Sequence, residues 1–117
     1  MQPSESEALA QALARACDGR KASDVIILDL RSFSYVTDLF VIATGENSRH
    51  LRALSEAVAE ETKKLGASRY GAEPVWASGW ALLDYVDVVV HLFTPELRDY
   101  YELDQLWGDA RRLERQE

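Results

Sequence analysis

The sequence predicts a single α/β domain in which helices cover a mixed β-sheet. Two observations carry the prediction: apolar runs of strand length alternate with segments of helical periodicity, and their order reads α-β-β-α-β-β-β-α. A length of 117 residues suits one domain with an ordinary core. We expect the domain to span residues 1–117, with loose ends at about residues 1–4 and 109–117.

The first half of the chain contains a helix and two strands. The helix carries Ala and Leu at helical spacing and ends near Gly19. Asp24–Leu30 is an apolar run that reads as the first strand, and Leu39–Thr44 reads as the second. The Ala-rich helix is expected to pack closely against the sheet.

The longest helix and a short edge strand follow. Asn47 or Ser48 is the expected N-cap of this helix, and Gly66 ends it. The next stretch is harder to place. We expect a short edge strand at about Arg69–Glu73 and a turn broken by Pro74.

Two near-continuous apolar runs form the centre of the second half. Trp80–Tyr85 and Val88–Phe93 have the length of strands, and only Val86 and Asp87 separate them. This spacing predicts a tight antiparallel hairpin, although neither residue is of the favoured Asn-Gly type. A helix should then run from about Pro95 to Trp107, starting after Thr94 as N-cap.

Composition limits the classes of partner and compartment. The formal net charge is −7 and the sequence pI is about 4.8, which argues against a broad nucleic-acid footprint and favours a basic partner. Cys17 is the single cysteine, so an intrachain disulfide is excluded and a reducing compartment fits best. We see no signal peptide and no membrane-spanning run, and we expect a cytoplasmic protein.

The junction Gly45–Ser48 between the second strand and the longest helix is a candidate anion site. Free N–H groups at a helix N-terminus attract anions. The segment lacks both the Lys-Ser/Thr pair and the three-glycine pattern of phosphate loops, and Glu46 places a negative charge where phosphate would lie. A turn followed by a helix cap is therefore the better interpretation.

Several acidic residues and one histidine suggest a magnesium-dependent transferase as an alternative. Asp29, Asp38, Asp84 and Asp87 lie in or beside strands, and paired carboxylates bind magnesium. Asp84 and Asp87 are three residues apart across a turn, so strand alternation does not place them on one face. His91, between valine and leucine, is interpreted as a core histidine hydrogen-bonded to one partner. We expect no catalytic residue, no cofactor and no metal site.

Tryptophan at the start of the hairpin suggests an interface. Strand alternation places Trp80, Leu82 and Asp84 on one face. It places Ala81, Leu83 and Tyr85 on the other. If the Ala81 face packs on the helices, the Trp80 face is an apolar patch with a charge beside it, as in protein interfaces. Trp80 covering the edge of the hairpin is an equally good interpretation.

The chain resembles the ribosomal silencing factor family (RsfS, also called Iojap) along roughly Leu9 to Trp107. The resemblance is carried by an ordered series of motifs: Thr37-Asp38, Phe40–Gly45, Ser48-Arg49-His50, Gly79–Phe93 (GWALLDYVDVVVHLF), Arg98, Tyr101, Leu103 and Leu106-Trp107. Two positions depart from the family pattern. Pro74 stands where the family usually has glycine, and Val86 replaces a glycine in the hairpin.

This resemblance implies a nucleotidyltransferase-like fold without catalysis. It implies a repressor that binds the large ribosomal subunit through ribosomal protein uL-fourteen and blocks joining of the small subunit when nutrients are scarce. The partner-binding residues expected from it are Trp80, Leu82, Asp84, Arg98 and Tyr101. It also implies a homodimer when free. A self-associating module with Trp80 at a homodimer seam is a further interpretation, and from charge and hydropathy we expect no membrane partner and no specific DNA binding.

Overall fold

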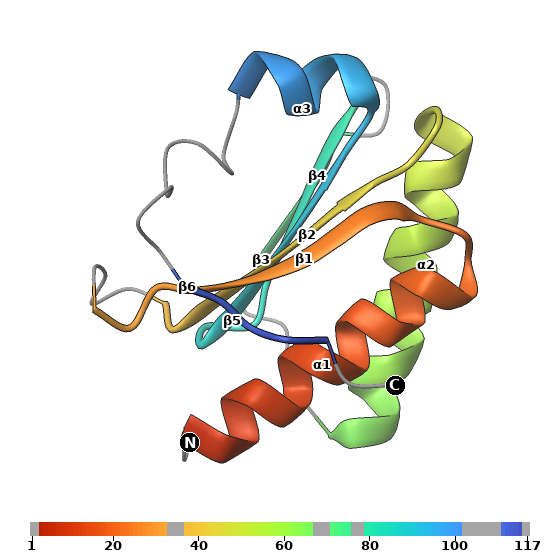
Figure 1. Cartoon of the computed structure of the whole chain (residues 1–117). Coiled ribbons are helices and arrows are strands. Elements are labelled where there is room, and N and C mark those ends of the chain that lie inside the picture. Colours follow the sequence, from red (N-terminus) through yellow and green to blue (C-terminus); the bar gives the residue numbers. More distant parts are fainter. Residues whose placement is uncertain (1–2, 33–36, 67–70, 76–78, 102–110, 116–117) are drawn as a thin grey trace.

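The structure is a computed structural model, and it describes residues 3–32, 37–66, 71–75, 79–101 and 111–115. Three helices and six strands make up this part of the chain (Figure 1). In order they are α1 (Pro3–Gly19), β1 (Ser23–Asp29), β2 (Leu39–Thr44), α2 (Ser48–Leu65), β3 (Gly71–Val75), β4 (Trp80–Asp84), β5 (Val88–Phe93), α3 (Pro95–Tyr101) and β6 (Arg111–Arg112). The predicted α/β class and the predicted element order are confirmed, with β6 added.

The strands form one mixed sheet in the order β3-β4-β5-β2-β1-β6. β2 and β5 pair in parallel at the centre, and the other neighbours pair antiparallel. Figure 1 shows α1 and α2 on one side of the sheet and α3 across one end of the other side. The long helix α2 connects β2 to β3. The half of the sheet made of β3, β4 and β5 therefore joins the half made of β2, β1 and β6 along the parallel pair β5–β2.

The main core lies between the sheet and the two long helices. It combines one face of α1 and one of α2 with every second residue of the central strands. Its fully buried members include Leu13, Leu51, Leu54, Val58, Leu39, Val41, Val90 and Leu92. Alanines on α1, such as Ala10 and Ala14, are also fully buried, which lets the helix approach the sheet closely, as predicted.

The opposite side of the sheet, which we call the second face, has a smaller core of its own. Leu28, Leu30, Ile42 and Phe93 are buried there, and α3 adds Leu97. Phe40 and Trp80 pack against this cluster and remain half-buried. The second face is therefore apolar along its middle, although α1 and α2 lie on the other side.

Both ends of α2 have the predicted caps. The Asn47 side chain accepts a hydrogen bond from the His50 backbone N–H at 2.9 Å. Gly66 adopts a left-handed conformation with φ of 72°, and its N–H bonds to carbonyls of the last turn. The Glu46 N–H donates to His50 Nδ1. Backbone N–H groups that would have to bind an anion at this helix start are thus already bonded to side chains. The cap interpretation of this junction is confirmed.

The prediction of a turn at Pro74 is wrong. It lies within β3, opposite Ala81 of β4. β3 is the outermost strand on its side of the sheet, and proline is tolerated in edge strands because one side of such a strand has no ladder partner. The prediction placed the edge strand about two residues early and ended it at proline, which an edge position tolerates.

The chain end also differs from the prediction. The described part of α3 ends at Tyr101, and the rest of the helix predicted as far as Trp107 lies outside the described residues. Arg111–Arg112 were expected in a loose end but form β6, paired with Leu28 and Asp29 of β1. A strand of two exposed residues has no hydrophobic period, so the sequence pattern gave no sign of it.

The β4–β5 turn holds a valine in an unfavourable conformation. Val86 has φ of 73° and is 48% exposed. The Asp87 N–H donates to the Tyr85 carbonyl across it at 2.9 Å, which is a tight three-residue turn. The Asp84 carboxylate accepts from the Val86 N–H at 2.7 Å and stabilises the turn. A β-branched residue at positive φ is strained, and Val86 stands where the resemblance expects glycine.

We predict that Val86→Gly stabilises the protein by about 1 kcal/mol, because glycine adopts this φ without strain. The gain is measured as a higher midpoint of thermal or urea unfolding. Val86→Ala is the matched control: it removes the branched side chain but keeps a Cβ, so its gain should be smaller. A Val86→Gly variant that unfolds more easily than the parent contradicts this account of the turn.

Candidate functional site: the second face of the sheet

The alternation predicted for β4 is confirmed. Ala81, Leu83 and Tyr85 are buried against the helices, whereas Trp80, Leu82 and Asp84 project from the second face and are half-buried. Apolar surface that borders solvent on a sheet is the usual setting of a protein contact. The geometry therefore makes the region around β4 and β5 the candidate site.

Three parallel rings give this region its shape. Trp80 lies opposite Phe93 in the β4–β5 register, and His91 is two residues before Phe93 on the same face. The ring centroids of Trp80, His91 and Phe93 lie 5.8–6.3 Å apart, and their planes are within 10° of parallel. Phe40 of β2 meets the imidazole edge-on at 4.5 Å. The four rings form one contiguous group, of which Phe40 and Trp80 are half-buried and His91 and Phe93 are buried; we call it the aromatic cluster.

His91 lies at the centre of this cluster and departs from its prediction. It is only 6% exposed, as expected for a core residue. Leu82 and Ile42 lie opposite it on the two neighbouring strands. Neither ring nitrogen has a hydrogen-bond partner within the described part of the chain, so the prediction of one bonded partner is wrong. A buried polar group of this kind costs stability, and few occur in folded proteins.

Burial also determines the charge of His91. Loss of solvation lowers the pKa of its imidazole to about 4, from an ordinary value near 6.5. The ring is therefore neutral at physiological pH and presents one N–H donor and one acceptor nitrogen.

Arg98, predicted as a partner-binding residue, holds α3 in place. Its Nη1 donates to the Asp24 carbonyl at 2.6 Å and to Thr44 Oγ1 at 2.8 Å. Asp24 lies in a register shift of the β1–β2 ladder, so Arg98 satisfies a carbonyl beside the irregularity. Sequence spacing gave no sign of this role. The side chain of Tyr101, another predicted contact, lies outside the described residues.

The acidic residues of the enzyme alternative do not form one cluster: the Asp38 N–H donates to the Asp87 carbonyl at 3.0 Å, so these two are adjacent, whereas the other two lie apart. Asp29 on β1 and Asp84 on β4 are separated by β5 and β2. Asp29 accepts two hydrogen bonds from the Arg31 guanidinium, at 2.9 and 2.8 Å, which lowers the pKa of its carboxyl group. Arg31 also reaches Glu7 at 2.6 Å and so ties β1 to α1. Among the residues that the structure describes, no three His, Cys, Asp or Glu side chains cluster as metal ligands would.

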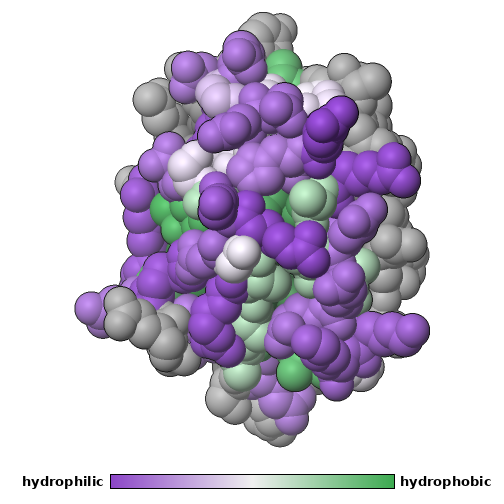
Figure 2. All heavy atoms as spheres, turned by 90° about the vertical axis from the view of Figure 1, so that its right-hand side faces the viewer, coloured by the Kyte–Doolittle hydropathy of each residue, from purple (hydrophilic) through white to green (hydrophobic). Residues whose placement is uncertain are grey.

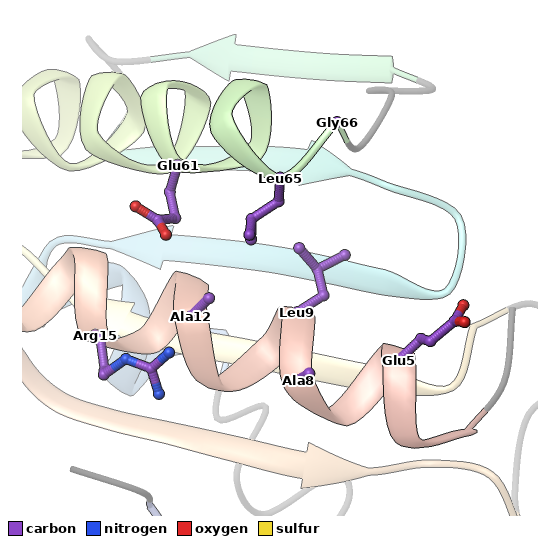
Figure 3. A pocket seen from close by; sticks show the side chains of 8 residues that line it. All are labelled: Glu5, Ala8, Leu9, Ala12, Arg15, Glu61, Leu65 and Gly66. Atoms are coloured by element: carbon purple, nitrogen blue, oxygen red, sulfur yellow. The ribbon is translucent and has the colours of Figure 1, made fainter.

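The helix side of the molecule is a different surface. Figure 2 shows it as largely hydrophilic, with smaller apolar areas between hydrophilic residues. A groove of about 490 Å³ runs between α1 and α2, with Leu9 and Leu65 inside it and Glu5, Arg15 and Glu61 at its rim (Figure 3). Charges at the rim of a seam between packed helices are ordinary. Substitutions on this side are therefore suitable controls for substitutions on the second face.

The comparison with protein families decides the classification. A family profile described as "Ribosomal silencing factor during starvation" (RsfS) matches residues 3–117. The chain belongs to the ribosomal silencing factor family. Ribosomal silencing factor RsfS of Bacillus subtilis is 36% identical over 97 residues, which cover 83% of this chain and 82% of that protein.

A solved structure confirms the fold of this silencing-factor chain. A crystal structure from Chromobacterium violaceum is similar with a TM-score of 0.81 and 35% identity, covering 92% of this chain and 88% of that one. A more distant relative, the mouse protein named "Mitochondrial assembly of ribosomal large subunit protein 1", is 33% identical over 89 residues. These residues cover 74% of this chain and 39% of the mouse protein. None of the described helices of this family member has the length and apolarity to cross a membrane.

We predict that the free energy of unfolding falls as the pH is lowered from about 6.5 to 4. The unfolded chain binds a proton on His91 below pH 6.5, whereas the folded state resists protonation down to about pH 4. The loss from this residue amounts to roughly 3 kcal/mol at most. Urea unfolding measures the free energy of unfolding of the parent and of His91→Gln across this pH range. The difference between the two pH profiles isolates the contribution of His91, because all other groups titrate alike in both proteins. Parallel pH profiles for the two proteins would refute the assignment.

Proposed function

We propose that this protein represses translation by binding the large ribosomal subunit and sterically blocking its association with the small subunit under nutrient limitation. The proposed contact on the ribosome is ribosomal protein uL-fourteen, and the proposed compartment is the cytoplasm. Membership of the ribosomal silencing factor family supports the ribosome-associated role. The mouse relative, named for large-subunit assembly, supports the choice of subunit.

The observation that carries the proposal is the aromatic cluster, of which Trp80 is half-buried, together with the half-buried Leu82 beside it on β4. Rigid aromatic side chains at the centre of a patch supply most of the affinity in many protein interfaces. Blocking subunit joining needs a stable contact but no chemistry, and about 800 Å² per partner is enough. The proposal is therefore a non-enzymatic one.

Charge supports a protein partner with basic character. The chain has a net charge of −7, and Asp84 borders the aromatic cluster on β4. Complementary charge steers association and helps to select the partner. Arg98 contributes by holding α3 against the sheet. Tyr101, at the end of α3, completes the proposed set.

The free protein is proposed to be a homodimer that uses the same patch, with Trp80 at its seam. In the absence of the ribosome, a second copy of the chain can bury the same apolar surface. Dimer and ribosome complex then compete for one face.

We predict that Trp80→Ala weakens binding to large subunits about thirtyfold, or roughly 2 kcal/mol, while the protein still folds. Trp80 is half-buried, so its loss should lower the melting temperature less than loss of a fully buried core residue. Sedimentation with large subunits measures binding, and a thermal melt measures folding. Leu65→Ala on the helix side is the control, since Leu65 is 53% exposed there and should bind normally. A collapse in melting temperature of Trp80→Ala would assign Trp80 to the core instead.

We predict that order of addition decides the outcome of subunit joining. Protein added to free large subunits should prevent joining, because it occupies the face that the small subunit needs. Protein added to joined ribosomes should act only as fast as these dissociate. Sucrose-gradient sedimentation with tagged protein measures both. Stable presence of the protein on joined ribosomes would overturn the occlusion mechanism.

A further inference from the structure

The groove between α1 and α2 leaves apolar surface open to solvent. Figure 3 shows Leu9 of α1 and Leu65 of α2 pointing toward one another across it. Leu65 is 53% exposed, and among the described residues the other large hydrophobic residue so exposed is Val86 in the β4–β5 turn. The buried side of α2 ends with Thr62, so packing of the helix on the sheet does not use Leu65. A volume of about 490 Å³ is within the range of ligand-binding sites.

Glu61, in the wall of this groove, is the acidic residue of α2 that the fold leaves without a cation. Glu56 pairs with Arg52 at 3.4 Å, and Glu60 pairs with Arg20 at 3.6 Å. Glu61 is half-buried, yet it makes no hydrogen bond or ion pair within the described part of the chain. A carboxylate that is partly withdrawn from water is stabilised by a cation that donates a hydrogen bond to it.

The charges of the groove select a basic occupant. Of the residues that line it, Glu5 and Glu61 are acidic and Arg15 is basic. The C-terminal end of α2 lies at the groove and adds the partial negative charge of its last carbonyls. Lys63 and Lys64 of the same turn are exposed and do not line the groove. The whole chain has a net charge of −7, so a second copy would set two acidic grooves against one another.

We propose that the groove binds a basic amphipathic helix of another protein, whose apolar ridge packs on Leu9 and Leu65 and whose lysine or arginine pairs with Glu61. A groove between two packed helices accepts a third helix through residues at i, i+3, i+4 and i+7 spacing. Ala8 and Ala12 let the partner approach α1 closely. The groove lies on the side of the sheet opposite the second face, so this contact does not rest on the proposed function and does not compete with it.

A designed helical peptide tests the groove directly. The peptide has about 18 residues, with leucine at i, i+3, i+4 and i+7 spacing and with lysine and alanine at the other positions. A second peptide carries glutamate in place of every lysine. In fluorescence anisotropy the lysine peptide should bind the parent protein with micromolar affinity, and the glutamate peptide should bind at least about tenfold more weakly. Equal binding of the two peptides would refute the basic character of the occupant.

Variants of the groove separate the apolar contribution from the charged one. Leu65→Ala should weaken binding of the lysine peptide about tenfold, and Glu61→Gln should weaken it about fivefold. Arg15→Gln is the matched control, because it also neutralises one charge of the groove but should not weaken binding of a basic helix. None of the three side chains is fully buried, so thermal melts of the variants should stay close to that of the parent.

The same variants give the results that would overturn the proposal. Failure of the lysine peptide to bind at up to about 1 mM, or undiminished binding by Leu65→Ala and Glu61→Gln, refutes the groove as its site. Weaker binding by Trp80→Ala would assign the peptide to the second face instead. Dissociation of the free homodimer by Leu65→Ala, measured by sedimentation equilibrium, would assign the groove to a second copy of the chain. Sedimentation of the parent with large subunits reports on the proposed function separately.

Discussion

The structure depends on an imbalance between the sheet and its helices. Six strands present two broad faces, and the two long helices cover only one of them. Strand alternation nevertheless supplies apolar residues to both faces, because the central strands β2 and β5 are buried on both sides. The helix side receives small and aliphatic residues that pack closely. The second face receives the aromatic rings, which have only the short helix α3 of the described helices against them.

Holding α3 on the second face requires specific local contacts. Gly79, with φ of 81°, precedes β4, and a Cβ there would lie 2.7 Å from Thr94 Oγ1. The Thr94 N–H donates to the Gly79 carbonyl, so the start of β4 and the start of α3 are joined. Arg98 makes the second attachment, to Asp24 and Thr44. These contacts fix one end of the face and leave Trp80 and Leu82 half-buried beside it.

Two residues of the β4–β5 hairpin reduce stability. Val86 strains the turn that ends β4, and His91 buries two nitrogens without partners. Natural proteins retain such costs mainly where function benefits. The two cases are not equivalent, because Val86 stands at an exposed turn. His91 occupies the centre of the proposed contact.

Strong periodic signals made most of the fold predictable. The β4–β5 hairpin, the caps of α2 and the face that carries Trp80 all follow from alternation, from Asn47 and Gly66, and from apolar run length. Features that depend on sheet neighbours were not predictable. Pro74 is tolerated because β3 is an edge strand, β6 forms because β1 is available to pair, and Arg98 finds its acceptors 74 and 54 residues away in sequence. The missing partner of His91 is likewise a property of the assembled sheet, and the sequence pattern suggested a partner instead.

Hydrogen–deuterium exchange of the protein, free and bound to purified large subunits, tests most directly that the second face is the docking face. Backbone amides of β4, the β4–β5 turn and α3 should be protected in the complex, whereas the exposed turns of α1 and α2 should exchange as in the free protein. A homodimer through the same face would reduce the difference, so the free sample is measured at a concentration where the protein is monomeric. Protection confined to α1 and α2, with β4 and α3 unchanged, would contradict the account.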